Sequence, residues 1–146
     1  MMSHTYSALL VHCVFSTKDR RDLITGPERL WQYFGGIARA RNIPLVAAGG
    51  TANHVHLLLD LPTTVPMSEA LQHLKGSSSH WLKQQKAAFA WQQGYGAFAI
   101  GQSQRQTMIA YIARQPEHHR KWSFEQEFLA LLRKSGIQYD RRFVLG

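Results

Sequence analysis

The chain has 146 residues, and its 17 lysines and arginines against 9 aspartates and glutamates give a formal net charge of +8. A chain of this length with no internal repeat or low-complexity linker is expected to form one domain over residues 1–146. Cys13 is the single cysteine and can form no internal disulfide, and no apolar run reaches the roughly 18 residues of a membrane span. These features exclude a secreted disulfide scaffold and a membrane protein, and they favour a cytoplasmic one.

The surplus of basic residues favours a polyanionic partner, most often a nucleic acid. The acidic residues are thinly scattered along the chain: they are Asp19, Asp22, Glu28, Asp60, Glu69, Glu117, Glu125, Glu127 and Asp140. Enzymes that cut nucleic acids often hold two metal ions in a cage of carboxylates, and few acids are available here to build one. If the protein is a nucleic-acid enzyme, we expect its metal ligands and its nucleophile to be other residue types.

Hydrophobic periodicity and turn residues predict the order strand, helix, strand, strand, helix, strand, followed by two more helices. The expected strands are residues 6–17, 44–49, 54–61 and 95–100. The expected helices are residues 27–41, 67–82, 104–115 and 124–135, with Pro116 stopping the third, a capping box of Ser123 and Gln126 opening the last, and Gly136 ending it. This order is typical of the ferredoxin-like or split βαβ arrangement, an α+β fold with a four-stranded antiparallel sheet. Two helices cover one face of such a sheet, and the other face is left free for a ligand, a partner or a further helix.

The sharpest feature of the sequence is His54-Val55-His56, in the third predicted strand. Side chains at i and i+2 of a strand point to the same face, so the two imidazoles lie side by side. Val55, Leu57 and Leu59 then fall on the opposite, core-facing side. Two neighbouring histidines on the open face of a strand make half of a divalent-metal site. Two surface histidines, or one satisfied in the core, would produce the same pattern.

Tyr111 and Gln115 stand four residues apart in the third predicted helix and so share one of its faces. A tyrosine hydroxyl can attack phosphorus and form a covalent phosphotyrosine, and a glutamine amide oxygen can serve as a third metal ligand. Taken alone, the pair is more typical of an ordinary helix surface. Together with His54 and His56 it describes a device for phosphodiester cleavage, in which a metal polarises the phosphate and a positioned nucleophile attacks it, with no carboxylate required.

At these residues the chain resembles a known family. Asn53–Leu59 is similar to the HUH motif, and Tyr111–Gln115 followed by His118-His119 is similar to the tyrosine helix of the single-tyrosine HUH transposases. These are the small transposases, of the insertion sequence 200/605 type, whose elements move as single-stranded DNA. The likeness extends over most of the chain in motif order and spacing. Its other segments are residues 15–21, 74–78, 89–92 and 94–98.

The resemblance implies an activity and its partners. Members of this family have a ferredoxin-like core, form homodimers, and often complete the site of one subunit with the tyrosine helix of the other. They are prokaryotic, DNA-associated enzymes that bind a hairpin in single-stranded element ends, cut the strand and form a 5′-phosphotyrosine link, with Mg²⁺ or Mn²⁺ and without ATP. On this pattern His54, His56 and Gln115 are the metal ligands and Tyr111 is the nucleophile. Because imidazole is a softer ligand than Mg²⁺ prefers, we expect Mn²⁺ to bind more tightly.

Other residues could take part by type alone, and we expect most of them to be structural. Packing is the expected role of the other tyrosines considered, which are Tyr6, Tyr33, Tyr95 and Tyr139. His118 and His119 could aid the site or DNA binding, although ending the helix or lying on the surface is the commoner role of such residues. His12, in the middle of the first strand, is expected to be part-buried and hydrogen-bonded. Three tryptophans could stack on unpaired bases, with packing expected for at least two of them: Trp81, Trp91 and Trp122.

Basic residues of the first loop and of the second helix are candidate phosphate contacts. They are Lys18, Arg20, Arg21, Lys75, Lys83 and Lys86. A solvated charged face explains each of them equally well. Two alternatives to an active transposase also stay open. One is a catalytically silent module that binds single-stranded nucleic acid on the same sheet, and the other is a host-domesticated relative that acts on repeated hairpins.

Overall fold

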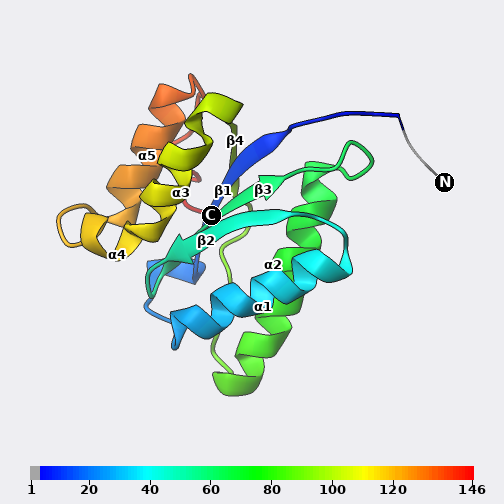
Figure 1. The fold of residues 1–146 in the computed structure, drawn as a ribbon. Coiled ribbons are helices and arrows are strands. Elements are labelled where there is room, and N and C mark those ends of the chain that lie inside the picture. Colours follow the sequence, from blue (N-terminus) through cyan, green and yellow to red (C-terminus); the bar gives the residue numbers. More distant parts are fainter. Residues whose placement is uncertain (1–3) are drawn as a thin grey trace.

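The strands of the sheet follow the predicted topology. In the computed structural model, which describes residues 4–146, they are Leu10–Ser16 (β1), Leu45–Gly50 (β2), His54–Asp60 (β3) and Gly96–Ala99 (β4). They pair antiparallel in the order β2-β3-β1-β4 (Figure 1), which confirms the predicted ferredoxin-like α+β fold. The first strand begins at Leu10 and not at Tyr6, because the register pairs Leu10 with Asp60, the last residue of β3.

The helices of residues 4–146 match the predicted ones except at Pro116. They are Pro27–Ala40 (α1), Met67–Gln85 (α2), Arg105–Ala113 (α3), Gln115–His118 (α4) and Phe124–Lys134 (α5), with short 3-10 turns at Lys18–Arg20 (η1) and Gln102–Gln104 (η2). The prediction that Pro116 stops the third helix is wrong, since α3 ends before Arg114 and Pro116 lies in the first turn of α4. Proline is tolerated there because the N–H groups of a first turn have no helical acceptor. No helix in this part of the chain has the length and apolar character needed to cross a bilayer.

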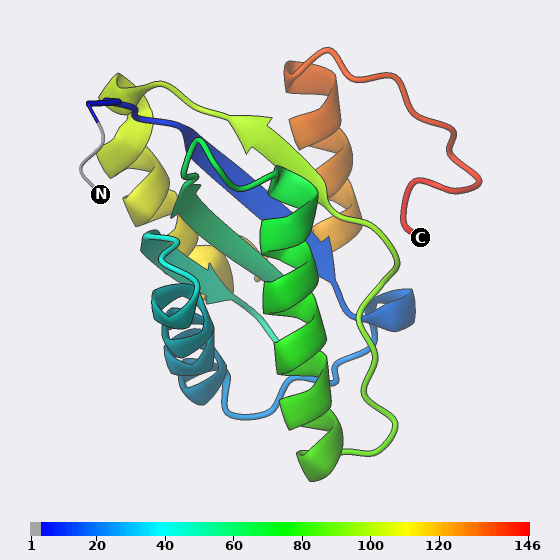
Figure 2. The same cartoon turned by 90° about the vertical axis from the view of Figure 1, so that its right-hand side faces the viewer.

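One face of the sheet packs against α1 and α2 (Figure 2). Along β3 the side chains of Val55, Leu57 and Leu59 point to this face and are fully buried, as predicted. Burial of each such side chain contributes about 1.5–3 kcal/mol to the free energy of unfolding. Since side chains alternate along a strand, the same packing turns His54 and His56 to the opposite face.

The opposite face is covered by α3 and α5 of the same chain (Figure 1). Ile112 of α3 packs against Leu10 and Leu58. Gly49 of β2 permits this close approach, because a Cβ atom at Gly49 would collide with the carbonyl oxygen of Ile112. The face that the fold leaves free is therefore used by further helices, and one of them carries Tyr111.

Packing of α5 is fixed by its first turn and its apolar stripe. The predicted capping box is present: the Ser123 hydroxyl accepts from the Gln126 backbone N–H at 3.1 Å, and the Gln126 side chain accepts from the Ser123 N–H at 2.9 Å. Beyond the cap, Phe124, Phe128 and Leu132 are buried in one cluster with Val14 and Phe98 of the sheet. This contact holds α5 beside the two histidines of β3.

Candidate metal and nucleophile site

His54 and His56 project side by side from β3 beneath α3 and α5. Both side chains are completely buried, so the alternative of two surface histidines is wrong. Their rings lie 5.1 Å apart, centroid to centroid, in an edge-on arrangement. Burial of two imidazoles next to each other requires that each ring nitrogen find a partner.

Gln115 and Tyr111 come to this histidine pair from the other side. The Nε2 atom of His54 donates to Gln115 Oε1 at 2.8 Å, and Gln115 is fully buried. The ring of Tyr111 packs edge-on to the ring of His56, with centroids 5.7 Å apart. The structure therefore brings together all four residues that the sequence singled out, and all four belong to one chain. Tyr111 and Gln115 stay close together although α3 ends at Ala113, because Gln115 begins the next helix, α4.

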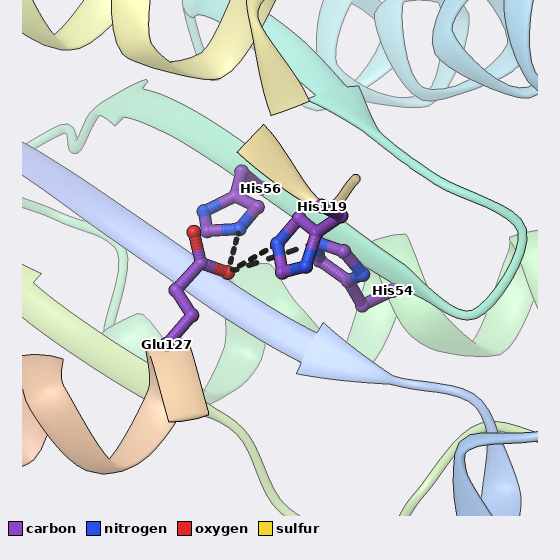
Figure 3. Close-up of side chains that lie close together, drawn as sticks. All are labelled: His54, His56, His119 and Glu127. Carbon is purple, nitrogen blue, oxygen red and sulfur yellow. Dashed lines mark hydrogen bonds and ion pairs between the residues drawn. The ribbon is translucent and has the colours of Figure 1, made fainter. Parts of the chain in front are cut away.

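Glu127 of α5 joins this cluster, and Figure 3 shows one of its oxygens facing three histidine rings. Its Oε1 atom is 2.9 Å from His56 Nε2, 3.1 Å from His119 Nε2 and 3.7 Å from His54 Nε2. Its Oε2 atom accepts hydrogen bonds from the Tyr111 hydroxyl and, at 2.9 Å, from Gln115 Nε2. The predicted site required no carboxylate, yet the structure places one within it.

Sequence reasoning missed Glu127 and gave His119 too little weight. A signal for Glu127 was present, because it falls on the apolar stripe of the last helix, between Phe124 and Phe128 and next to the latter. A carboxylate on a buried helix face must be paired, so its position itself indicates a polar cluster. For His119, the ring packs against that of His54 at 4.3 Å between centroids, a contact that depends on how α4 leads into α5.

Hydrogen-bond roles in the site follow from the carboxylate of Glu127, which can only accept. His56 donates through Nε2 to Glu127 at 2.9 Å, and its Nδ1 atom shares a hydrogen bond of 2.7 Å with His12 Nε2. Burial, followed by the nearby His56, lowers the pKa of His12 to about 3. Burial, again followed by His56, lowers the pKa of His54 to about 3. His12 is thus the buried, hydrogen-bonded histidine that the sequence predicted, and both rings are neutral at pH 7.

Tyr111 and Glu127 hold opposite protonation states. Burial, reinforced by the hydrogen bond to Glu127, raises the pKa of the Tyr111 hydroxyl. Burial alone would raise the pKa of Glu127, but hydrogen bonds from His119, His56 and Tyr111 keep it well below its usual range. The site therefore contains a neutral phenol that donates to a charged carboxylate.

Acid should unfold the protein through its buried histidines. In the unfolded chain His12 and His54 take up protons near pH 6.5, whereas in the fold they stay neutral down to about pH 3. The unfolded state then binds more protons, so the free energy of unfolding should fall by up to about 2–3 kcal/mol for each pH unit below 6.5. Urea unfolding between pH 7 and pH 5, with a chelator present, measures this slope. His12→Gln should make it shallower, and a stability that stays constant over this range would contradict the assignment.

The donor set of the site fits a divalent metal ion. Ligand atoms of His54, His56, His119 and Glu127 all lie within 4.8 Å of one another. A histidine that binds a metal through Nε2 usually donates its other ring N–H to an acceptor. Asn53 Oδ1, 2.8 Å from His54 Nδ1, is such an acceptor, and His12 Nε2, 2.7 Å from His56 Nδ1, is another when the proton of His12 is on its Nδ1. A shift of each ring proton to Nδ1 would free both Nε2 atoms for an ion.

Two open grooves meet at Tyr111, which is half-buried. One, of about 810 Å³, runs past α3 and α4 and carries the basic residues Arg114, Arg120 and Lys121. The other, of about 580 Å³, runs along α5 to Arg133 and Lys134. Both grooves are also lined by His118 and by Trp122, whose side chain is 52% exposed. The candidate nucleophile Tyr111 thus lines two grooves that also carry basic residues.

Comparison with known protein families identifies the family of this chain. Residues 5–115 match the family described as Transposase IS200 like. The chain belongs to the IS200-like transposase family. The chain is 33% identical over 88 residues to the transposases for insertion sequence element IS200 of Salmonella typhimurium LT2 and Salmonella typhi. The match covers 58% of this chain and 57% of each relative, so the chain spans little more than half the length of these curated relatives.

Solved structures share the fold of this IS200-like transposase. A crystal structure from Deinococcus radiodurans R1, assigned as a transposase, aligns with a TM-score of 0.64 at 21% identity and covers 79% of this chain and 96% of its own. The REP-associated tyrosine transposase bound to a REP hairpin aligns with a TM-score of 0.62 at 18% identity and covers 82% of this chain and 74% of its own. At these identities the likeness establishes the common fold.

The basic residues that the sequence predicted as DNA contacts lie in two separate places. Lys75, Lys83 and Lys86 lie on or just after α2, on the far side of the sheet from Tyr111 (Figure 2). Lys75 donates to the carbonyl oxygens of Gln92 and Gly94, and burial lowers its pKa to about 8. By contrast, η1 and the following Arg21 lie near the start of β3, where Asn53 Nδ2 donates to the Arg20 carbonyl at 3.3 Å. All six contacts stay predictions, and those of η1 and Arg21 lie nearer the site.

Proposed function

We propose that the protein cleaves and rejoins single-stranded DNA through a covalent 5′-phosphotyrosine on Tyr111, assisted by a divalent ion on His54, His56 and Gln115. The observation that carries this proposal is the packing of Tyr111 against a buried histidine pair in a member of the IS200-like transposase family. The bound ion would act as a Lewis acid on the scissile phosphate. Mn²⁺ and Mg²⁺ both suit a site of imidazole and amide oxygen, and Mn²⁺ should bind more tightly.

In the proposed reaction, the Tyr111 oxygen attacks phosphorus and the bond from phosphorus to the 3′ oxygen breaks. The 3′ oxygen leaves with a proton as a free 3′-OH, and the 5′ phosphate stays bound to the tyrosine. The carboxylate of Glu127 already accepts a hydrogen bond from the Tyr111 hydroxyl, so it is the nearest acceptor for the proton that tyrosine loses. Rejoining is the reverse step, in which a 3′-OH attacks the phosphotyrosine and restores a phosphodiester.

The two grooves at Tyr111 provide a path for the single strand. Arg114, Arg120 and Lys121 on one side and the end of α5 on the other can bind phosphates that flank the scissile one. The exposed ring of Trp122 lies where an unpaired base can stack. A hairpin in the element end is the substrate feature that the family likeness adds, and one structure of similar fold is bound to a hairpin.

The proposed site uses residues of one chain. Tyr111 contacts the Glu127 and His56 of its own chain, so we propose that this tyrosine acts in its own subunit. A homodimer, which the family likeness implies, is compatible with this arrangement but does not have to supply a site residue.

A gel shift that resists denaturant tests the proposal. The full chain is incubated with Mn²⁺ and single-stranded DNA that contains a hairpin and a flanking strand, and covalent adduct is then resolved under denaturing conditions. We expect an adduct that needs the divalent ion and forms with single-stranded but not duplex DNA. Binding of the same DNA without any adduct would instead identify a catalytically silent binding module.

A further inference from the structure

We propose that Glu127 is a fourth protein ligand of the divalent ion, so that α5 completes the metal site from outside the part of the chain that matches the family. This inference rests on the proposed metal site of His54, His56 and Gln115. The family match ends at residue 115, so Glu127 comes from a helix that the match does not include. The proposal thus assigns a metal-binding role to the last helix of this chain.

The positions of the donor atoms support a shared ion. Ligand atoms that each lie about 2.1 Å from one metal ion are about 3–4 Å from each other. Glu127 Oε1 is 2.9 Å from His56 Nε2 and 3.7 Å from His54 Nε2. Gln115 Oε1 in turn is 2.8 Å from His54 Nε2. These separations are those of a ligand set that closes around one ion after small shifts.

The charge of Glu127 also calls for a cation. Its side chain is only 2% exposed, and within residues 4–146 its ion-pair partners are all histidines, with no lysine or arginine among them. A buried carboxylate without a fixed positive partner is costly, and a divalent ion is a common way to compensate it. Two carbonyl-type oxygens and two imidazoles form a mixed set that suits Mn²⁺ or Mg²⁺ better than imidazoles alone.

The two oxygens of Glu127 divide their contacts in a way that suits this role. Oε1 faces the imidazoles of His54 and His56, and His119 Nε2 at 3.1 Å holds it there. Oε2 faces the Tyr111 hydroxyl and Gln115 Nε2, with His118 Nε2 at 3.5 Å. One carboxylate can therefore bind the ion through Oε1 and keep the nucleophile beside it through Oε2. The opposite role, in which Glu127 merely fills the metal position and competes with the ion, predicts the reverse effect of removing its charge.

Direct measurement of Mn²⁺ binding tests the assignment. Free Mn²⁺ is followed by electron paramagnetic resonance during titration of the full chain without DNA, for the wild type and for Glu127→Gln. We expect Glu127→Gln to weaken Mn²⁺ binding by at least about 10-fold, as the loss of an outer partner alone can do. Glu125→Gln removes an exposed carboxylate from the same first turn of α5 and should leave the affinity unchanged. Thermal unfolding with chelator and with Mn²⁺ should show a smaller metal-induced rise in Tm for Glu127→Gln.

Unchanged or tighter Mn²⁺ binding by Glu127→Gln would overturn the assignment. If this variant does not fold in chelator, Glu127→Asp keeps the charge but is one methylene shorter. It should also bind Mn²⁺ more weakly, and wild-type affinity would overturn the proposal equally.

The outcome of this test can be told apart from that of the test of the proposed function. A wild type that forms the adduct while Glu127→Gln binds Mn²⁺ normally refutes the ligand alone, whereas loss of Mn²⁺ binding in Glu127→Gln with no wild-type adduct refutes the reaction alone.

Discussion

Tyr111→Phe should bind hairpin DNA with wild-type affinity and form no covalent adduct. Phenylalanine keeps the ring that packs against His56 and removes only the oxygen that would attack phosphorus. Cleavage should fall by at least about 1,000-fold, because no other group can form the proposed ester linkage. The measurement is the denaturant-resistant gel shift, together with an equilibrium binding assay on the same DNA.

The fold of Tyr111→Phe should persist. Glu127 keeps His56, His119 and Gln115 as hydrogen-bond donors when the hydroxyl is removed. Tyr33→Phe is the matched control. Tyr33 of α1 stacks on Trp81 of α2 at 4.5 Å between ring centroids, and these two helices cover the face of the sheet opposite the site. A Tyr111→Phe protein that still forms the adduct would refute Tyr111 as the nucleophile.

The second large effect is expected from His56→Gln. Glutamine is polar and nearly fills the space of the ring, but its amide is a weaker ligand than imidazole. It also interrupts the path from His12 through His56 to Glu127. Mn²⁺ affinity should fall by at least about 10-fold, and adduct formation at a fixed Mn²⁺ concentration should fall further. Titration of Mn²⁺ and adduct yield measure the two effects separately.

His80→Gln is the control for this substitution. His80 is exposed on α2, on the far face of the sheet, so its loss should change neither quantity. If His56→Gln retained wild-type Mn²⁺ affinity, the histidine pair would be a packing feature and not a metal site.

A mixture of the two inactive variants distinguishes one-chain from shared sites. If Tyr111 acts on the DNA held by its own His54 and His56, Tyr111→Phe mixed with His56→Gln should form no adduct. Exchange of the tyrosine helix between subunits would instead restore part of the activity, because some sites would combine an intact tyrosine with an intact histidine pair. The adduct assay on preincubated mixtures, compared with each variant alone, decides between them.

Local patterns account for what could be predicted. The alternation of Val55, Leu57 and Leu59 with the two histidines fixed which face of β3 carries the site, because the period of a strand is two residues. The four-residue spacing of Tyr111 and Gln115 placed them on one face, because residues four apart lie about one helical turn from each other. Pro116 was misjudged because a proline can either stop a helix or begin one, and only the path of the chain after Arg114 decides.

By itself, the sequence determined the fold class and the family, and it predicted that His54, His56, Tyr111 and Gln115 form one site, since each of these conclusions depends on patterns of residues close together along the chain. Only the tertiary structure decided that Glu127 and His119 join them. His56 and Glu127 are 71 residues apart, and their contact depends on where the apolar stripe of α5 packs against Val14 and Phe98. The low number of acids in the sequence suggested a site without a carboxylate. The fold instead places one of these few acids at its centre, because burial on a helix face and not abundance determines which charges meet.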